Sequence, residues 1–161
     1  MNNFTDLIFI FGAKYLYLVV IISSFIWFLN QPKPKRKEIF IIACLCLPLA
    51  FIFSKVAGHL YYSLQPFVVG HFQPLIQHKA DNGFPSHHAL LVFAISAIIF
   101  IFSRRTGLVL WILGLFVGFS RIYVGVHHMI DIIGSMLISI VSVTLVYFIR
   151  KTWDRFYFLK K

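Results

Sequence analysis

Apolar residues along the chain fall into long runs separated by short polar segments. The runs cover residues 7–29, 39–58, 88–103, 107–119 and 129–149. About 20 apolar residues in a helix, at about 1.5 Å per residue, cross the hydrocarbon core of a bilayer. The pattern therefore predicts an all-α integral membrane protein. We expect a helical bundle of about five transmembrane spans that forms a single domain over residues 1–161.

The third and fourth runs, 88–103 and 107–119, are short. They hold roughly 13 to 16 residues each, which corresponds to about 20–24 Å of helix. The hydrocarbon core is about 30 Å thick. We therefore expect the outer ends of these two spans to lie slightly below the membrane surface, at the depth of lipid headgroups.

Two polar connections are candidate functional loops, residues 59–87 and 120–128. The first is the longest connection in the chain, and long loops in small domains are usually functional. Its beginning, residues 60–69, is apolar and aromatic and is expected to form a short helix along the membrane interface.

Basic residues predict the orientation. Lys and Arg gather in the 31–38 loop, in the 103–106 turn, and in a tail that contains Arg150, Lys151, Arg155, Lys160 and Lys161. With five spans these three segments fall on one side, which the positive-inside rule makes cytoplasmic. The N-terminus and both candidate loops then face outward.

Composition agrees with a membrane protein. Hydrophobic residues make up 60% and charged residues 12% of the chain, and the formal net charge is +10. A soluble domain has about a quarter charged residues. The positive charge suits anionic headgroups, and nucleic acid is not expected as a partner. Cys44 and Cys46 are expected to be packing residues, and no cleavable signal is evident.

Residues 120–131 read Ser-Arg-Ile-Tyr-Val-Gly-Val-His-His-Met-Ile-Asp between two apolar runs. Ionisable groups at such a place must be paired or face a polar cavity. On a helix, His127 and Asp131 would share one face. The carboxylate could accept the Nδ1 proton and leave Nε2 as a nucleophile. Arg121 could donate a planar fork to a phosphate, and Gly125 suits a bend between the Arg and the His.

A second stretch, residues 84–88, reads Phe-Pro-Ser-His-His before another apolar run. Ser86 is a good helix N-cap, and the free N–H groups of a helix N-terminus bind anions. His88 could donate a proton there.

Pro85-Ser86-x-His88 followed by Ser120-Arg121-x5-His127-x3-Asp131 resembles the type 2 phosphatidic acid phosphatase (PAP2) superfamily over roughly residues 55–150. That group comprises integral membrane lipid phosphatases and shares its site design with vanadium haloperoxidases. Within this superfamily, the segment Asp81-x-x-Phe84-Pro85-Ser86-x-His88-Ala89 looks most like the small bacterial undecaprenyl-diphosphatases.

The resemblance implies a PAP2/haloperoxidase-like core and a reaction through a phosphohistidine. His127 would attack phosphorus, Asp131 would hold its imidazole, and His88 would protonate the leaving oxygen. Arg121, Ser86 and backbone N–H groups near His87 would bind the phosphoryl oxygens. Neither a metal nor a cofactor is expected.

The first family motif departs from its usual form, Lys-x6-Arg-Pro. Here Lys55 is followed after nine residues by Gln65-Pro66. Lys55 and Gln65 are the matching candidates for phosphate binding, although Gln donates without bringing a charge. Lys79 or His71 could supply the missing cation.

The implied function is hydrolysis of a polyprenyl diphosphate, such as undecaprenyl diphosphate, to the monophosphate at the outer face of a bacterial plasma membrane, which recycles a carrier lipid. Two alternatives stay open. One is another lipid phosphatase, acting on phosphatidylglycerol phosphate, phosphatidic acid or lipid A. The other is a non-catalytic lipid-binding or transport protein, which Gln65 favours. The partners are a phosphorylated lipid and the bilayer, and the oligomeric state is not determined.

Each residue also has a simpler explanation. Ser86 could be only a cap, Arg121 only a headgroup anchor, and Lys14 a lysine that reaches the nearer surface or a cation facing the lipid phosphate. His59, His87 and His128 are expected to have no role. The grouping of His88, Arg121, His127 and Asp131 on one side favours the functional interpretation.

Overall fold

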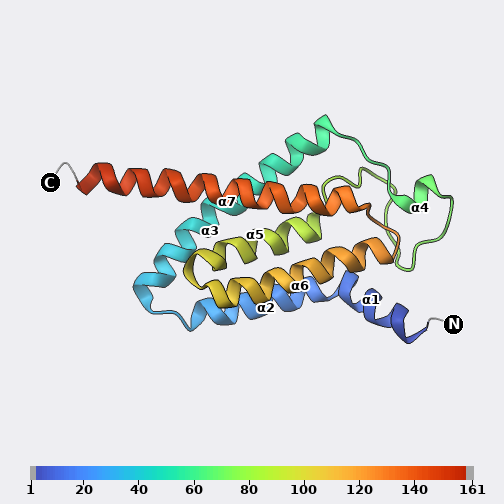
Figure 1. Cartoon of the computed structure of the whole chain (residues 1–161), viewed down its shortest axis with the longest axis horizontal. Coiled ribbons are helices and arrows are strands. Elements are labelled where there is room, and N and C mark those ends of the chain that lie inside the picture. The colour runs from blue at the N-terminus through green and yellow to red at the C-terminus, as the bar shows by residue number, and fades with distance from the viewer. Residues whose placement is uncertain (1–2, 159–161) are drawn as a thin grey trace.

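The computed structural model describes residues 3–158, with side chains as far as Trp153. Its helices are α1 (Phe4–Lys14), α2 (Leu16–Leu29), α3 (Lys33–Leu60), α4 (Pro66–Val69), α5 (His87–Phe102), α6 (Arg104–Tyr123) and α7 (Met129–Phe158). In Figure 1, α5, α6 and α7 run side by side, and α3 crosses them obliquely. Lys160 and Lys161 of the basic tail lie outside the described residues, as does the side chain of Arg155.

The all-helical membrane architecture is confirmed. α3, α6 and α7 are each long and apolar enough to cross a bilayer, and α1 with α2 forms a bent pair that could be a fourth span. α5 is apolar but has only 16 residues, or about 24 Å. It therefore has the short length that the sequence predicts for the third span.

The first apolar run is not one straight helix, contrary to the expected span 7–29. α1 ends at Lys14, and α2 leaves at an angle of 50°. Tyr15 between them has φ −126° and ψ −27°, outside helical geometry. The carbonyl of Ala13 accepts a hydrogen bond from Arg121 of α6 at 3.4 Å. Arg121 thus satisfies a backbone carbonyl at the break, and carbonyls at membrane depth need such a partner.

The other helix boundaries also differ from the expected ones. α3 begins at Lys33 inside the expected 31–38 loop, with Pro34 in its first turn, where proline fits because the N–H would be unpaired anyway. α6 has 20 residues, so the expected short fourth span is wrong. It continues through Tyr123, which places Arg121 on a helix rather than in the 120–128 loop.

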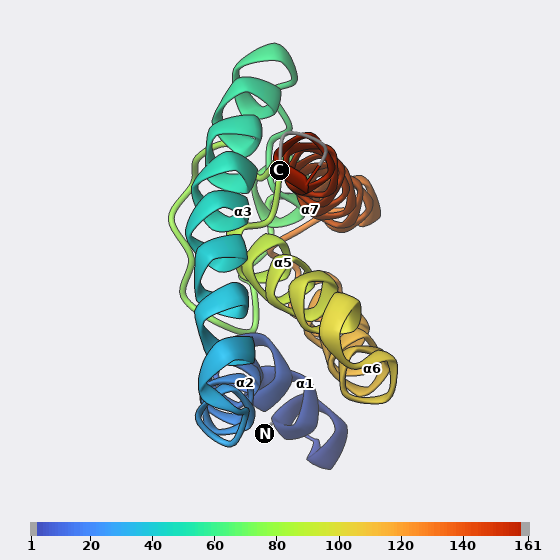
Figure 2. The same cartoon turned by 90° about the vertical axis from the view of Figure 1, so that its left-hand side faces the viewer.

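α5 is the central helix and packs against α2, α3, α6 and α7. On one side Val92 lies in a cluster with Val20 of α2 and Val117 of α6. On the other side Ile98 lies with residues of α3 and α7, including Cys46, which is a packing residue as expected. Figure 2 shows α3 along one flank and α7 beside α5 on the other.

Serine hydroxyls join α5 to α7. Ser135 Oγ lies 3.0 Å from the Ser86 carbonyl and 2.7 Å from the Asp131 carbonyl. Ser139 Oγ lies 3.0 Å from the carbonyl of Leu90. These bonds fix the N-terminal ends of α5 and α7 relative to each other.

The helix directions place both motif segments at one end of the molecule. Figure 1 shows the beginnings of α5 and α7, the ends of α3 and α6, the loop with α4, and the N-terminus together at that end. The α2–α3 connection, the turn at Ser103 and the end of α7 lie at the opposite end. The two candidate loops and the basic segments are therefore separated along the bundle, as the sequence predicts.

A close approach of α5 and α6 provides a stability test. A Cβ added at Gly107 would overlap the backbone of Phe100, and backbone cannot move aside as a side chain can. We expect Gly107→Ala to destabilise the protein by about 1–3 kcal/mol, seen as a lower thermal transition in detergent. Leu108→Ala, on the exposed neighbour, should change it little. An unchanged or higher transition for Gly107→Ala would contradict this close packing.

Candidate active site

His127 lies in the connection between α6 and α7, and Asp131 lies in the first turn of α7. Both are buried, with 4% and 0% of their surface exposed. His127 Nδ1 is 3.4 Å from Asp131 Oδ2, and the same oxygen accepts the backbone N–H of His128 at 2.8 Å. Because an ionised carboxylate only accepts, Nδ1 carries the proton, and Nε2 keeps its lone pair.

The pairing arises differently from the helical face that the spacing suggested. His127 precedes α7, so the two residues do not share a face of one helix. Asp131 instead reaches back to the start of its own helix, where a carboxylate is favoured by unpaired N–H groups.

A tight turn brings His127 close to Arg121. Gly125 has φ +82°, a backbone conformation that residues with a Cβ rarely adopt. The N–H of Gly125 donates to the carbonyl of Ile122, and the N–H of Val126 donates to that of Arg121. The chain therefore folds back over the end of α6, as Gly125 was expected to allow.

Arg121 is buried, with 3% of its surface exposed, and its hydrogen bonds within the described part of the chain all go to neutral acceptors. Its Nη2 lies 2.8 Å from His78 Nε2 and 3.3 Å from His127 Nε2, and its Nη1 lies 3.4 Å from the carbonyl of Ala13. Its Nε has no hydrogen-bond partner among the described residues. A buried cation without a paired carboxylate favours an anionic ligand.

Ser86 and His88 lie at the start of α5. Ser86 occupies the N-cap position, but its buried Oγ makes no hydrogen bond with any residue that the structure describes. The expected side-chain cap is thus absent, and the hydroxyl remains available to a ligand. His88 is half-buried and packs edge-on against Tyr17 of α2, with ring centroids 4.5 Å apart. It is near enough to Arg121 and His127 to interact with them electrostatically.

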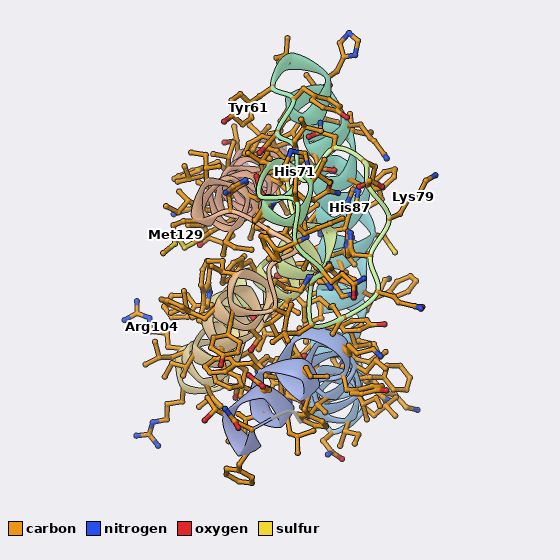
Figure 3. The ribbon with its side chains drawn as sticks, turned by 90° about the vertical axis from the view of Figure 1, so that its right-hand side faces the viewer. Tyr61, His71, Lys79, His87, Arg104 and Met129 are labelled. Carbon is orange, nitrogen blue, oxygen red and sulfur yellow. The ribbon has the colours of Figure 1, made fainter. Side chains whose placement is uncertain are left out.

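Three further candidates lie apart from this group. Lys55 is exposed on α3, with Nζ 5.2 Å from the Phe51 ring, and it lines a pocket of about 360 Å³ with His87. Lys79 is exposed, and its side chain points outward in Figure 3. His71, the alternative cation, is exposed as well. Within the described residues no hydrogen bond or ion pair joins these side chains to Arg121 or His127.

Gln65 is fully buried, and its amide is bonded within the loop. Nε2 donates to the Lys79 carbonyl at 3.1 Å and to Asp81 Oδ1 at 2.6 Å, and Oε1 accepts the N–H of Asp81 at 3.1 Å. Both amide hydrogens are therefore used. Gln65 holds the two limbs of the 61–86 loop together.

His78 and Tyr17 are site residues that the sequence did not reveal. His78 contacts Arg121 from a position 43 residues earlier in the chain, and its ring lies 5.7 Å from that of His127. Its neighbours in the sequence form no motif. Tyr17 lies on α2 just after the bend, and its ring packs against that of His88.

The assembled groups can perform phosphoryl transfer. An in-line displacement uses a nucleophile, charge stabilisers and an acid, and groups with this chemistry are present: a neutral imidazole lone pair, a buried guanidinium, a hydroxyl and a second imidazole. In the part of the chain that the structure describes, no group of three or more His, Cys, Asp or Glu residues is placed to bind a metal. The positive charge at this site comes from Arg121.

Comparisons with known proteins agree with this chemistry. A family model described as the PAP2 superfamily matches residues 39–155. The bacitracin transport permease protein BcrC of Bacillus licheniformis is 33% identical over 138 residues, covering 85% of this chain and 68% of that protein. The undecaprenyl-diphosphatase BcrC of Bacillus subtilis (strain 168) is 31% identical over 145 residues, covering 87% and 72%.

Two solved structures share the fold. LpxE of Aquifex aeolicus has a TM-score of 0.67 at 20% identity and covers 91% of this chain and 87% of its own. A transmembrane PAP2-type phosphatidylglycerolphosphate phosphatase from Bacillus subtilis has a TM-score of 0.63 at 17% identity, with 94% and 79% covered. The fold is therefore that of transmembrane PAP2-type phosphatases.

Burial lowers the pKa of His127 below its ordinary value of 6.5, and the hydrogen bond that His127 donates to Asp131 partly opposes this effect. We expect more than half of the His127 rings to be neutral at pH 6.5, as measured by nitrogen NMR of ¹⁵N-histidine in detergent. Asp131→Asn should lower the pKa of His127 further. The NMR signal that disappears in His127→Asn is assigned to His127. A pKa above 6.5 in the wild-type protein would contradict the site as described.

Proposed function

The chain belongs to the PAP2 superfamily, and we propose that it removes the terminal phosphate of a polyprenyl diphosphate, undecaprenyl diphosphate in particular. The observation that carries this proposal is the His127 lone pair beside a buried Arg121 that has no carboxylate partner among the described residues. The substrate is suggested by the name of the Bacillus subtilis relative, an undecaprenyl-diphosphatase.

In the first step, Nε2 of His127 attacks the terminal phosphorus. The bond from that phosphorus to the bridging oxygen breaks, and His88 gives its proton to this oxygen as the lipid monophosphate leaves. Arg121, Ser86 and the first N–H groups of α5 stabilise the charge on the three equatorial oxygens. Asp131 stabilises the imidazole as it becomes positively charged.

In the second step, water attacks the phosphohistidine. His88 takes a proton from the water, the bond between phosphorus and Nε2 breaks, and inorganic phosphate leaves. His127 recovers its lone pair, and the proton taken by His88 serves the next cycle. No group outside this set is needed, because Arg121 and N–H groups supply the stabilising charge.

The position of the site in the bilayer supports a lipid substrate. α5 is about 24 Å long, so its N-terminal end lies near headgroup depth, and a lipid phosphate can enter while its chain stays in the membrane. The basic segments at the opposite end favour a site on the outer face of a bacterial plasma membrane. The N-terminus then lies outside and the C-terminus lies in the cytoplasm.

Two other functions remain as alternatives. One of the solved structures that share the fold is a PAP2-type phosphatidylglycerolphosphate phosphatase, so another phosphorylated lipid is a candidate substrate. The Bacillus licheniformis relative is named as a transport permease protein, which corresponds to a non-catalytic role. The nucleophile, cation and acid gathered at one site favour catalysis.

Phosphate release by the purified protein distinguishes these functions. Undecaprenyl diphosphate, phosphatidylglycerol phosphate and phosphatidic acid would be compared in detergent at equal concentrations. We expect the highest kcat/KM for undecaprenyl diphosphate. A higher value for a glycerolipid would replace the proposed substrate, and binding of the lipid without phosphate release would support transport or storage.

Replacing His127 tests the nucleophile. We expect His127→Ala to lower kcat by about a thousandfold or more, because a covalent route cannot proceed without it. His128→Ala is the matched control, since His128 is the next residue and its ring contacts the carbonyl of Leu64 instead. That variant should stay within about tenfold of wild type. A His127→Ala protein with activity in the same range would refute the mechanism.

The chemistry proposed here also predicts metal independence. Activity should be unchanged after prolonged incubation with EDTA and removal of the chelator. The check is phosphate release before and after this treatment, with a metal-dependent phosphatase treated in parallel. Loss of activity that added divalent ions restore would contradict the mechanism.

A further inference from the structure

We propose that His78 is a positioning residue for phosphoryl transfer. His78 holds the Arg121 guanidinium in a position where the guanidinium binds the phosphoryl group and leaves the lone pair of His127 free. The inference rests on the proposed function and adds a residue to the same site. His78 lies in the loop between α4 and α5, outside both motifs that identified the other site residues.

The tautomer of His78 follows from its two contacts. Nδ1 lies 3.0 Å from the Lys79 carbonyl, which can only accept, so Nδ1 carries a proton. Nε2 lies 2.8 Å from Nη2 of Arg121, which can only donate. The ring that fits both partners is neutral, with its lone pair on Nε2 directed at the guanidinium.

The same Nη2 serves two acceptors. Its longer contact, 3.3 Å, is to Nε2 of His127, and a strong bond there would occupy the electron pair that attacks phosphorus. The shorter contact to His78 holds Arg121 on the loop side. When a phosphoryl oxygen takes the hydrogen that faces His127, His78 still holds the other hydrogen. Arg121 Nε, which has no partner among the described residues, provides a second donor.

Gln65 holds His78 in place through a shared carbonyl. The Lys79 carbonyl accepts from Nδ1 of His78 and also from Nε2 of Gln65, whose Oε1 accepts the N–H of Asp81. An arginine at this position could donate but could not accept from Asp81. Gln65, the candidate match to the family's usual arginine, thus fits a loop that presents His78 to Arg121.

Two substitutions of His78 with similar polarity distinguish a positioning role from a role in loop stability alone. The amide of Gln in His78→Gln reaches the position of Nε2, whereas the amide of Asn in His78→Asn reaches only that of Nδ1. We expect His78→Asn to lower kcat and to weaken inhibition by vanadate, each by about tenfold. His78→Gln should stay within about threefold of wild type in both measurements. Gln77→Leu, on the exposed neighbour, should match wild type.

The dependence on Arg121 is tested by a double-mutant cycle. In an Arg121→Lys background, His78→Asn should change the vanadate inhibition constant by less than about twofold, because the residue acts through the guanidinium. Equal losses from His78→Asn in both backgrounds, or equal losses from the Gln and Asn variants, would overturn the inference. Circular dichroism and size-exclusion chromatography check that each variant is folded.

An error in the proposed substrate can be distinguished from an error in the role of His78. If wild type prefers another phosphorylated lipid, the same variants are compared on that lipid. Binding of vanadate alone, measured by calorimetry, requires no lipid at all. Wild-type affinity in His78→Asn would reject the role of His78, whatever the natural substrate is.

Discussion

A buried guanidinium, that of Arg121, is the constraint on which the active end of this protein depends, because it has no carboxylate partner among the residues that the structure describes. Burying the charge of Arg121 is costly unless its donors are satisfied. Three separate segments supply neutral acceptors: the break after α1, the 61–86 loop and the turn after α6. Together these segments leave a buried positive charge, which favours an anionic ligand.

The central helix α5 connects this site to the membrane. Its hydrophobic sides pack between α2, α6, α3 and α7, and serine hydroxyls of α7 hold its first turns. In the proposed function, a helix of this length ends near headgroup depth, and Ser86 and His88 would meet a lipid phosphate there. The packing that stabilises the bundle thereby also sets how deep in the membrane the proposed site lies.

The departure from the family's first motif acquires a structural explanation. From the sequence, Gln65 suggested a weakened phosphate site or a non-catalytic protein. In the structure its amide joins Lys79 to Asp81 and orders the segment that carries His78. The loop thereby supplies His78, which contacts Arg121.

The sequence by itself determined the apolar helices, the separation of basic segments from motif loops, and the pairing of His127 with Asp131. Each depends on composition or on residues close together in the sequence, although His127 and Asp131 meet at the start of α7 and not on one face of a helix. Only the tertiary structure decided the break at Tyr15, the contact of His78 with Arg121 and the buried position of Gln65. The path of a long aperiodic loop is fixed by contacts with distant helices, and the first span bends at Tyr15, where the Ala13 carbonyl has a partner on α6. Neither fact is encoded in local spacing.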